Sequence, residues 1–166
     1  MNDLVAFVGL GVMGRPMAEN MAKKFEVHGF DTNPDRFVGL SGVTRSGSVA
    51  ELVSKSKVVC MSLPSANAVE SVIFGPDGVL GKLQPGTLVI DLSTGLPASS
   101  RKIEMAFSAI DCCYVDAPVS GGEQGAKEGT LAIMVGAKES VFNRSLPFLQ
   151  AIGSSVVRAG DVGAGG

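Results

Sequence analysis

The sequence contains little of what marks several large classes of protein. Its 166 residues include no tryptophan, one tyrosine, one histidine and three cysteines. The 14 basic and 16 acidic residues leave a net charge of −2, so there is no electrostatic basis for binding nucleic acid or an anionic membrane. No apolar run reaches the roughly 18 residues of a membrane span. What remains is the composition of a globular domain, large enough to form a substantial hydrophobic core.

The scarcity of cysteine and histidine also argues against a metal centre. Cys60 lies in an apolar run, Cys112 and Cys113 are adjacent, and no other cysteine or histidine stands at metal-ligand spacing. We therefore expect no metal, and buried, reduced thiols of the kind found inside cells. No basic segment precedes the first apolar run, so we expect no secretory signal. The expected location is the cytoplasm or an organelle matrix.

Glycine, in contrast, is abundant, with 22 residues, and three of them follow the spacing of a dinucleotide-binding turn. The apolar segment 4–8 leads into Gly9-Leu10-Gly11-Val12-Met13-Gly14, and a helical pattern continues to about residue 23. In G-x-G-x-x-G the first glycine permits a tight turn, the second lets a pyrophosphate approach the backbone, and the third allows close helix packing. The helix N-terminus then offers free N–H groups to the phosphates. On its own, the spacing also fits a tight structural turn.

An acidic residue at the end of the second predicted strand strengthens the dinucleotide interpretation. Residues 26–30 are followed by Asp31, about 20 residues after the first glycine, the spacing this fold requires. A carboxylate there accepts hydrogen bonds from the adenosine ribose and repels a 2′-phosphate, so the sequence favours NAD over NADP. The alternative is that Asp31 only caps a turn. Arg36 could reach a 2′-phosphate, but we interpret it as an exposed helix residue.

Short apolar strands alternate with helices along the rest of the chain. We expect further strands over 43–44, 57–63, 87–92, 112–115, 130–135 and 154–158, and helices starting near 34, 48, 67, 97 and 138. The nearly continuous apolar composition of 57–63 and 87–92 indicates strands that are buried on both faces of a parallel sheet. This pattern predicts an α/β fold of the Rossmann type, a doubly wound and mainly parallel sheet. After Ala117 the connections shorten, so we expect antiparallel strands added at one edge.

A second glycine-rich stretch, residues 116–131, has the chemistry of a carboxylate site. It opens with Asp116-Ala117-Pro118-Val119-Ser120-Gly121-Gly122, directly after the sixth predicted strand. A serine hydroxyl beside two glycines offers unobstructed N–H groups at a helix start, which suits a small carboxylic acid. An ordinary glycine-rich loop is the alternative. Asn67, at the start of a predicted helix, also has two possible roles: it caps the helix or it contacts a ligand.

Together these segments resemble the β-hydroxyacid dehydrogenase family, which includes 3-hydroxyisobutyrate, tartronate semialdehyde and 6-phosphogluconate dehydrogenases. The matching segments span nearly the whole chain: residues 9–14, Leu63-Pro64 with Asn67, Ser93-Thr94 with Pro97, and residues 116–131. The resemblance implies that the cofactor contacts are Gly9, Leu10, Gly11, Val12, Met13, Gly14, Asp31, Thr32, Leu63, Pro64, Asn67 and Thr94. It implies that the substrate contacts are Ser120, Gly121, Gly122 and Thr94. The family's NADP-preferring members usually carry Asn-Arg-Thr where this chain has Asp31-Thr32-Asn33, which again favours NAD.

By this resemblance the reaction is the reversible oxidation of a small 3-hydroxy acid, with hydride passing to the nicotinamide. The hydroxyl proton needs a general acid or base. We interpret His28, in the second strand, as structural, and Lys127 lies in a variable-looking part of the second motif. In the family the proton is handled by a lysine on a long helix that follows a glycine-rich turn like Gly163–Gly166. We therefore expect no catalytic residue within this chain.

The same resemblance gives the expected domain organisation. Residues 1–162 form the dinucleotide-binding domain, and 163–166 begin a linker to an all-helical domain through which the parent enzyme forms a homo-oligomer. The alternative is a non-catalytic module that binds a dinucleotide for sensing or assembly. A methyltransferase fits less well, because the G-x-G-x-x-G spacing and the second motif both argue against it. A P-loop is excluded because no Gly-Lys-Ser/Thr follows the first glycines.

Overall fold

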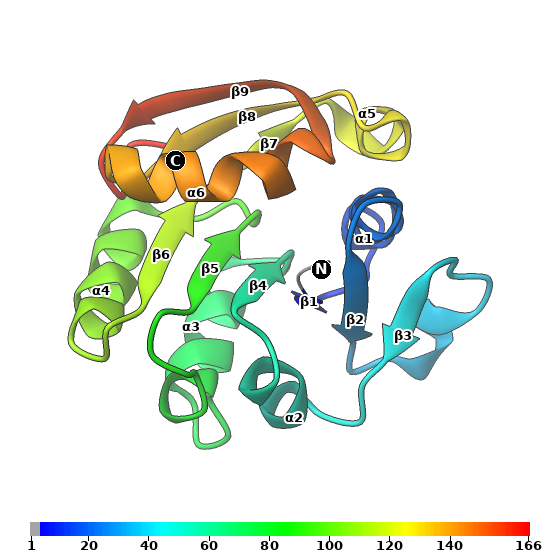
Figure 1. Ribbon diagram of the computed structural model, residues 1–166, viewed down its shortest axis with the longest axis horizontal. Helices are drawn as coiled ribbons and strands as arrows, with labels where there is room; N and C mark the ends of the chain where they lie inside the picture. Colours follow the sequence, from blue (N-terminus) through cyan, green and yellow to red (C-terminus); the bar gives the residue numbers. More distant parts are fainter. Residues whose placement is uncertain (1–3) are drawn as a thin grey trace.

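The strands of the computed structural model, which describes residues 4–166, form one sheet with helices on both faces (Figure 1). The strands are β1 (Leu4–Val8), β2 (Glu26–Phe30), β3 (Val43–Arg45), β4 (Val58–Met61), β5 (Leu88–Asp91), β6 (Cys113–Asp116), β7 (Val119–Ser120), β8 (Leu131–Gly136) and β9 (Gly153–Gly160). Their order is β3-β2-β1-β4-β5-β6-β8-β7, with β9 paired to β8. All pairs from β3 to β6 are parallel, which confirms the predicted doubly wound sheet.

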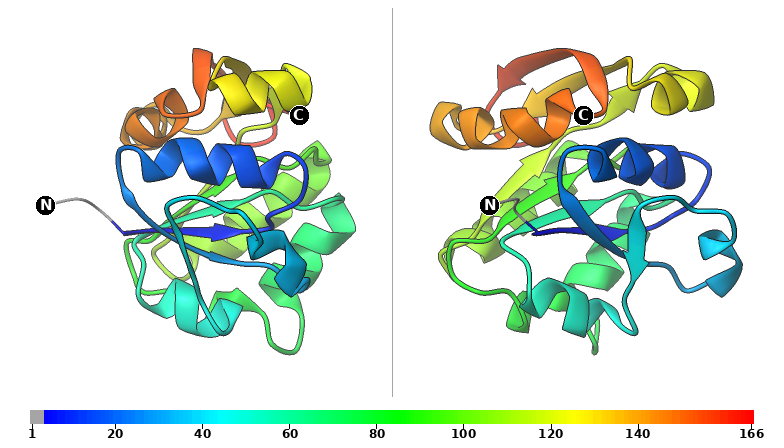
Figure 2. Two further views of the ribbon diagram at one scale, coloured as in Figure 1. Left: turned by 90° about the vertical axis from the view of Figure 1, so that its right-hand side faces the viewer. Right: turned by 45° about the vertical axis from the view of Figure 1, so that its right-hand side comes forward.

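Six helices and two 3-10 turns connect these strands within the described residues. They are α1 (Gly14–Ala22), η1 (Pro34–Phe37), α2 (Val49–Ser54), α3 (Ala66–Phe74), η2 (Val79–Gly81), α4 (Pro97–Ser108), α5 (Gly122–Glu128) and α6 (Glu139–Gln150). Helices α1, α5 and α6 cover one face of the sheet, and α2, α3 and α4 cover the other (Figures 1 and 2). None of the helices in this part of the chain is long and apolar enough to cross a membrane.

The central strands are apolar on both sides because each side faces its own core. Along β1, Val5 and Phe7 pack against α1, whereas Ala6 and Val8 pack into the core beneath α2, α3 and α4. Strand residues point alternately to the two faces, so a strand covered on both faces needs no polar side. Cys60 of β4 is fully buried in the α1-side core, and burial raises the pKa of its thiol to about 12.

The far edge of the sheet reverses direction, as the sequence predicts. β8 is antiparallel to β6 at Asp116 and to β7 at Val119, while β9 runs parallel to β8. β6 and β7 thus pair in turn with one strand, separated by a short break at Ala117-Pro118. The sequence indicated a helix start near Gly122 but not the extent of α5, and it did not predict β7. A two-residue strand and a seven-residue helix are too short to show a clear periodicity.

Candidate functional site

The turn between β1 and α1 contains three glycines with different surroundings. Gly9 has a φ of +95°, and a Cβ there would overlap the carbonyl oxygen of Ser62 at the end of β4. A Cβ on Gly14 would overlap the carbonyl oxygen of Gly9. For Gly11, no described atom beyond the residue itself and its two chain neighbours lies within 4 Å of the position that a Cβ would occupy. The fold therefore requires Gly9 and Gly14, whereas Gly11 leaves an open approach to the backbone.

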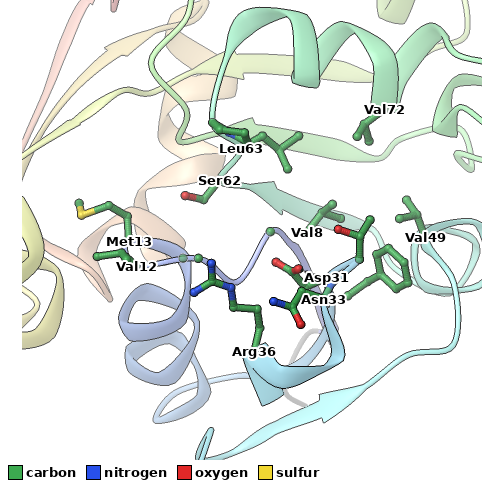
Figure 3. A pocket seen from close by; sticks show the side chains of 16 residues that line it. Val8, Val12, Met13, Asp31, Asn33, Arg36, Val49, Ser62, Leu63 and Val72 are labelled. Carbon is green, nitrogen blue, oxygen red and sulfur yellow. Dashed lines mark hydrogen bonds between the residues drawn. The ribbon is translucent and has the colours of Figure 1, made fainter. Parts of the chain in front are cut away.

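That open approach faces a cavity of about 560 Å³ at the carboxyl ends of β1, β2 and β4 (Figure 3). Of the residues predicted to contact a cofactor, those that line it are Gly9, Gly11, Val12, Met13, Gly14, Asp31, Thr32, Leu63 and Pro64. Lining residues that sequence reasoning did not name as contacts are Val8, Phe30, Asn33, Arg36, Val49, Ser62 and Val72. Most of these residues are apolar and lie in segments that the sequence predicted only as strand or helix. Nothing in their sequence indicates contact with a ligand.

Asp31 connects the glycine turn to the end of β2. Its Oδ2 accepts a hydrogen bond from the backbone N–H of Leu10 at 2.7 Å, and its Oδ1 accepts one from the N–H of Asn33 at 2.8 Å. The carboxylate therefore shapes the turn after β2, as the capping alternative requires, and also holds the glycine turn. A carboxylate offers about four acceptor positions, so it can still accept bonds from a ligand hydroxyl.

Two residues near Asp31 lie elsewhere than the sequence suggested. Arg36 is not a fully exposed helix residue. It ends the first turn of η1 half-buried, and its side chain lines the cavity near Asp31 (Figure 3). Leu10 is completely buried in the core beside α1, so a ligand could meet only its backbone, whose N–H is already bound to Asp31.

The loops after β4 and β5 meet beside the cavity. The N–H of Leu63 donates to the hydroxyl of Ser93 at 2.8 Å, and Ser93 itself is 6% exposed. Its neighbour Thr94 is exposed and does not line the cavity. Of the two polar residues in this loop, one is turned into the protein and the other remains accessible.

Asn67 is exposed on α3 and lies outside the cavity lining. The cap of that helix is Ser65, whose hydroxyl accepts a bond from the N–H of Ala68 at 3.1 Å. The capping interpretation of Asn67 is therefore wrong, because Ser65 stands two residues earlier at the position where the backbone is still extended. Its interpretation as a ligand contact stays a prediction.

The second motif forms an exposed turn at the start of α5. Ser120, Gly121 and Gly122 are exposed and do not line the cavity. Gly121 and Gly122 have φ values of +137° and +66°, a backbone conformation that favours glycine. The motif thus has a structural reason for its glycines, and its role with a substrate stays a prediction.

The first residue of that motif serves the fold. The Asp116 carboxylate accepts hydrogen bonds from the N–H groups of Gly163 at 2.8 Å and Gly165 at 2.9 Å. Burial raises the pKa of Asp116, although these backbone donors oppose the rise. Asp116 therefore anchors the final glycine-rich turn to the end of β6.

The two side chains considered for proton transfer are both placed away from the cavity. His28 lies 3.0 Å from Glu26 on the same strand, and Lys127 pairs with Glu123 at 3.0 Å beside the groove between α1 and α5. Neither lines the cavity at the glycine turn. The interpretation of His28 as structural stays a prediction.

Comparison with known proteins places this geometry in a group of relatives. The family described as the NAD-binding domain of 6-phosphogluconate dehydrogenase matches residues 4–160. The chain is 41% identical to 2-(hydroxymethyl)glutarate dehydrogenase of Eubacterium barkeri, covering 97% of this chain and 54% of that protein. It is 40% identical to 3-hydroxyisobutyrate dehydrogenase of Pseudomonas aeruginosa, covering 97% and 55%.

A solved structure agrees with these relatives. It is Mycobacterium tuberculosis 3-hydroxyisobutyrate dehydrogenase with L-serine, which superimposes with a TM-score of 0.93 at 36% identity. The match covers 99% of this chain and 57% of that one. The chain spans about half the length of the curated relatives it matches.

Proposed function

The chain belongs to the family of the NAD-binding domain of 6-phosphogluconate dehydrogenase, and from this premise we propose that it is the cofactor domain of an NAD-dependent dehydrogenase acting on a small 3-hydroxy acid. The observation that carries the proposal is the pairing of Gly11 with Asp31. One leaves the backbone open beside a cavity, and the other places a carboxylate in the same cavity. These are the two features that a dinucleotide needs at this turn, for its pyrophosphate and for its adenosine ribose.

The residues of the cavity fit such a cofactor. The N-terminus of α1 would hold the pyrophosphate through backbone N–H groups that have no partner within the helix. Asp31 would accept hydrogen bonds from the adenosine ribose, and its negative charge would disfavour a 2′-phosphate there. The nicotinamide ring, when bound, would supply the acceptor for the hydride. Arg36 is the one basic side chain that lines this cavity within the described residues, and it weakens the discrimination without reversing it.

The substrate class is proposed from the relatives. Two of them are named for hydroxy acids, 3-hydroxyisobutyrate and 2-(hydroxymethyl)glutarate. In this proposal Ser120, Gly121, Gly122 and Thr94 contact the carboxylic acid, and Asn67 contacts the cofactor. Neither His28 nor Lys127 lines the cavity. In this proposal the general acid or base is the lysine that the family resemblance implies, on a helix of a longer protein. Homo-oligomerisation of that protein through a helical domain is part of the same proposal.

The test is a fluorescence titration of the chain with NADH and with NADPH. We expect NADH to bind more tightly. Tighter binding of NADPH would refute the assignment of Asp31 as the residue that selects the cofactor, and no binding of either would refute the cofactor site.

A second experiment separates a dehydrogenase domain from a binding module used for sensing or assembly. The chain alone, with NAD and 3-hydroxyisobutyrate or related acids, is expected to give no NADH. A longer protein from the same gene that contains the proposed lysine is expected to give it. Turnover by the chain alone would contradict the placement of the acid or base, and inactivity of the longer protein on all such acids would favour the binding module.

A further inference from the structure

A buried carboxylate at the end of β5 remains outside the function proposed above. Asp91 is 4% exposed, and its Oδ2 accepts a hydrogen bond from the Tyr114 hydroxyl at 2.5 Å. Its Oδ1 accepts one from the backbone N–H of Ser93 at 3.0 Å. Burial raises the pKa of Asp91, and these donors oppose the rise. The carboxylate therefore holds the backbone of Ser93 at the end of β5.

Ser93 also contacts the neighbouring loop, which follows β4. Its hydroxyl oxygen accepts the hydrogen bond from Leu63 N–H, and Leu63 lines the cavity (Figure 3). Leu63 follows β4 and Ser93 follows β5, and these strands are paired in register at Met61 and Asp91. A single relay thus runs from Asp91 through Ser93 to Leu63, and it joins the two loops at the carboxyl ends of these strands.

We propose that Asp91 is a positioning residue for the part of the cofactor site that receives the nicotinamide end of the dinucleotide. The inference rests on the proposed function. In a doubly wound sheet a dinucleotide lies across the point where the strand order reverses, here between β1 and β4. Asp31 marks the adenosine half on the β2 side, so the other half lies over β4 and β5, where Asp91 holds the loops.

A purely structural role accounts for Asp91 less well. Burying a carboxylate is costly unless its charge is paired, and an apolar residue would fill the same space without that cost. None of the ion pairs found within residues 4–166 includes Asp91. Its two donors are the Tyr114 hydroxyl and the Ser93 N–H, and the second belongs to the loop that it positions. The acceptor oxygen of Asp91 therefore orders that loop, because a backbone N–H left without a partner in a buried site is costly.

The test compares two ligands that share an adenosine half. NADH carries the nicotinamide, and ADP-ribose does not. We expect Asp91→Ala and Ser93→Ala to weaken NADH binding about tenfold, the scale of one lost buried hydrogen bond, and to leave ADP-ribose affinity within about twofold. Asp91→Asn keeps an acceptor oxygen for Ser93 and is expected to restore most of the NADH affinity. Asp111→Asn and Ser108→Ala are matched controls, because both residues are exposed and lie outside the relay.

Hydrogen exchange at the Leu63 amide gives a readout that needs no ligand. It should be protected in the unsubstituted chain and in Asp91→Asn, and it should exchange rapidly in Asp91→Ala and Ser93→Ala. An equal loss of affinity for NADH and ADP-ribose, or no loss for either, would overturn the positioning role, as would a Leu63 amide that stays protected in both alanine variants. If the unsubstituted chain binds neither ligand, the proposed function fails and the positioning role at a cofactor site fails with it. Loss of protection at Leu63 would then support the relay as a feature of the fold alone.

Discussion

Two glycines of one turn differ in whether the fold could accommodate a side chain at their position: Gly11 leaves room for one, and Gly14 does not. A Cβ on Gly14 would overlap the carbonyl oxygen of Gly9, whereas a Cβ on Gly11 would meet no described atom within 4 Å apart from those of its two chain neighbours. We expect Gly14→Ala to destabilise the fold by about 1–3 kcal/mol through overpacking, and Gly11→Ala to leave stability nearly unchanged while weakening NADH binding. Urea unfolding and an NADH titration of both variants check this. Normal NADH affinity in a stable Gly11→Ala would show that the open space does not serve a ligand.

The same reasoning applies to the carboxylate across the cavity. Asp31→Ala should weaken NADH binding by about 1–3 kcal/mol, the scale of losing a charged hydrogen-bond partner. NADPH binding should fall less, because a negative charge beside the 2′-phosphate is removed as well. Titration with both cofactors measures the difference. Asp111→Ala, at an exposed position that does not line this cavity, is the control for a change in net charge. An unchanged NADH affinity would leave Asp31 with the structural role alone.

For individual residues, the sequence predicted where a residue lies better than it predicted which atoms that residue binds. The spacing of the glycines and of Asp31 was sufficient to predict that they meet at one edge of the sheet. It could not show that Asp31 binds the Leu10 amide, because that contact depends on how β1 and β2 are staggered in the folded protein. Asp116 is the clearest case, since its partner Gly163 lies 47 residues away and neither residue alone signals the contact.

In helix α3, one residue is expected to affect stability and another is expected to contact the ligand. Ser65 caps it, so Ser65→Ala should cost about 0.5–2 kcal/mol of stability. Asn67→Ala should cost almost none, because Asn67 is exposed and is not the cap. Urea unfolding compares the two variants. NADH titration of Asn67→Ala then tests the predicted contact with the cofactor, and a stability loss in Asn67→Ala equal to that of Ser65→Ala would contradict this assignment.

The regular elements were predictable and the short ones were not. Continuous apolar runs identified β4 and β5, because a strand covered on both faces has no polar side. η1 begins where a helix was predicted, near residue 34, but it is a 3-10 turn that ends at Phe37, and Arg36 lines the cavity. In such short segments tertiary packing decides the structure, so local sequence preference carries little information.

For the whole molecule, the two buried carboxylates predict how stability depends on pH. Burial raises the pKa of Asp91 and of Asp116 above the ordinary value of 3.8. A group whose pKa is raised on folding contributes stability below its unfolded pKa and loses that contribution as pH rises through its folded pKa. The free energy of unfolding of the unsubstituted chain should therefore fall relative to that of Asp91→Asn as pH is raised from 4 to neutrality.

Urea unfolding of both proteins at several pH values across this range measures the difference. Asp111→Asn, which removes an exposed carboxylate near the opposite end of β6, should show no such trend. A pH-independent difference between Asp91→Asn and the unsubstituted chain would mean that the Asp91 pKa is the same in the folded and unfolded states.

The hydrogen bond between Asp31 and Leu10 also limits how cofactor choice could change during evolution. The side chain that would disfavour NADP also holds the turn that would cradle the pyrophosphate. A mutation that removes its charge and its oxygen together would admit the phosphate and loosen the turn in the same step. A substitution that removes the charge but keeps an acceptor oxygen at position 31 avoids this loss. Asparagine meets both conditions, and alanine does not. A switch from NAD to NADP would then begin with Asp31→Asn, and a basic neighbour could be added afterwards.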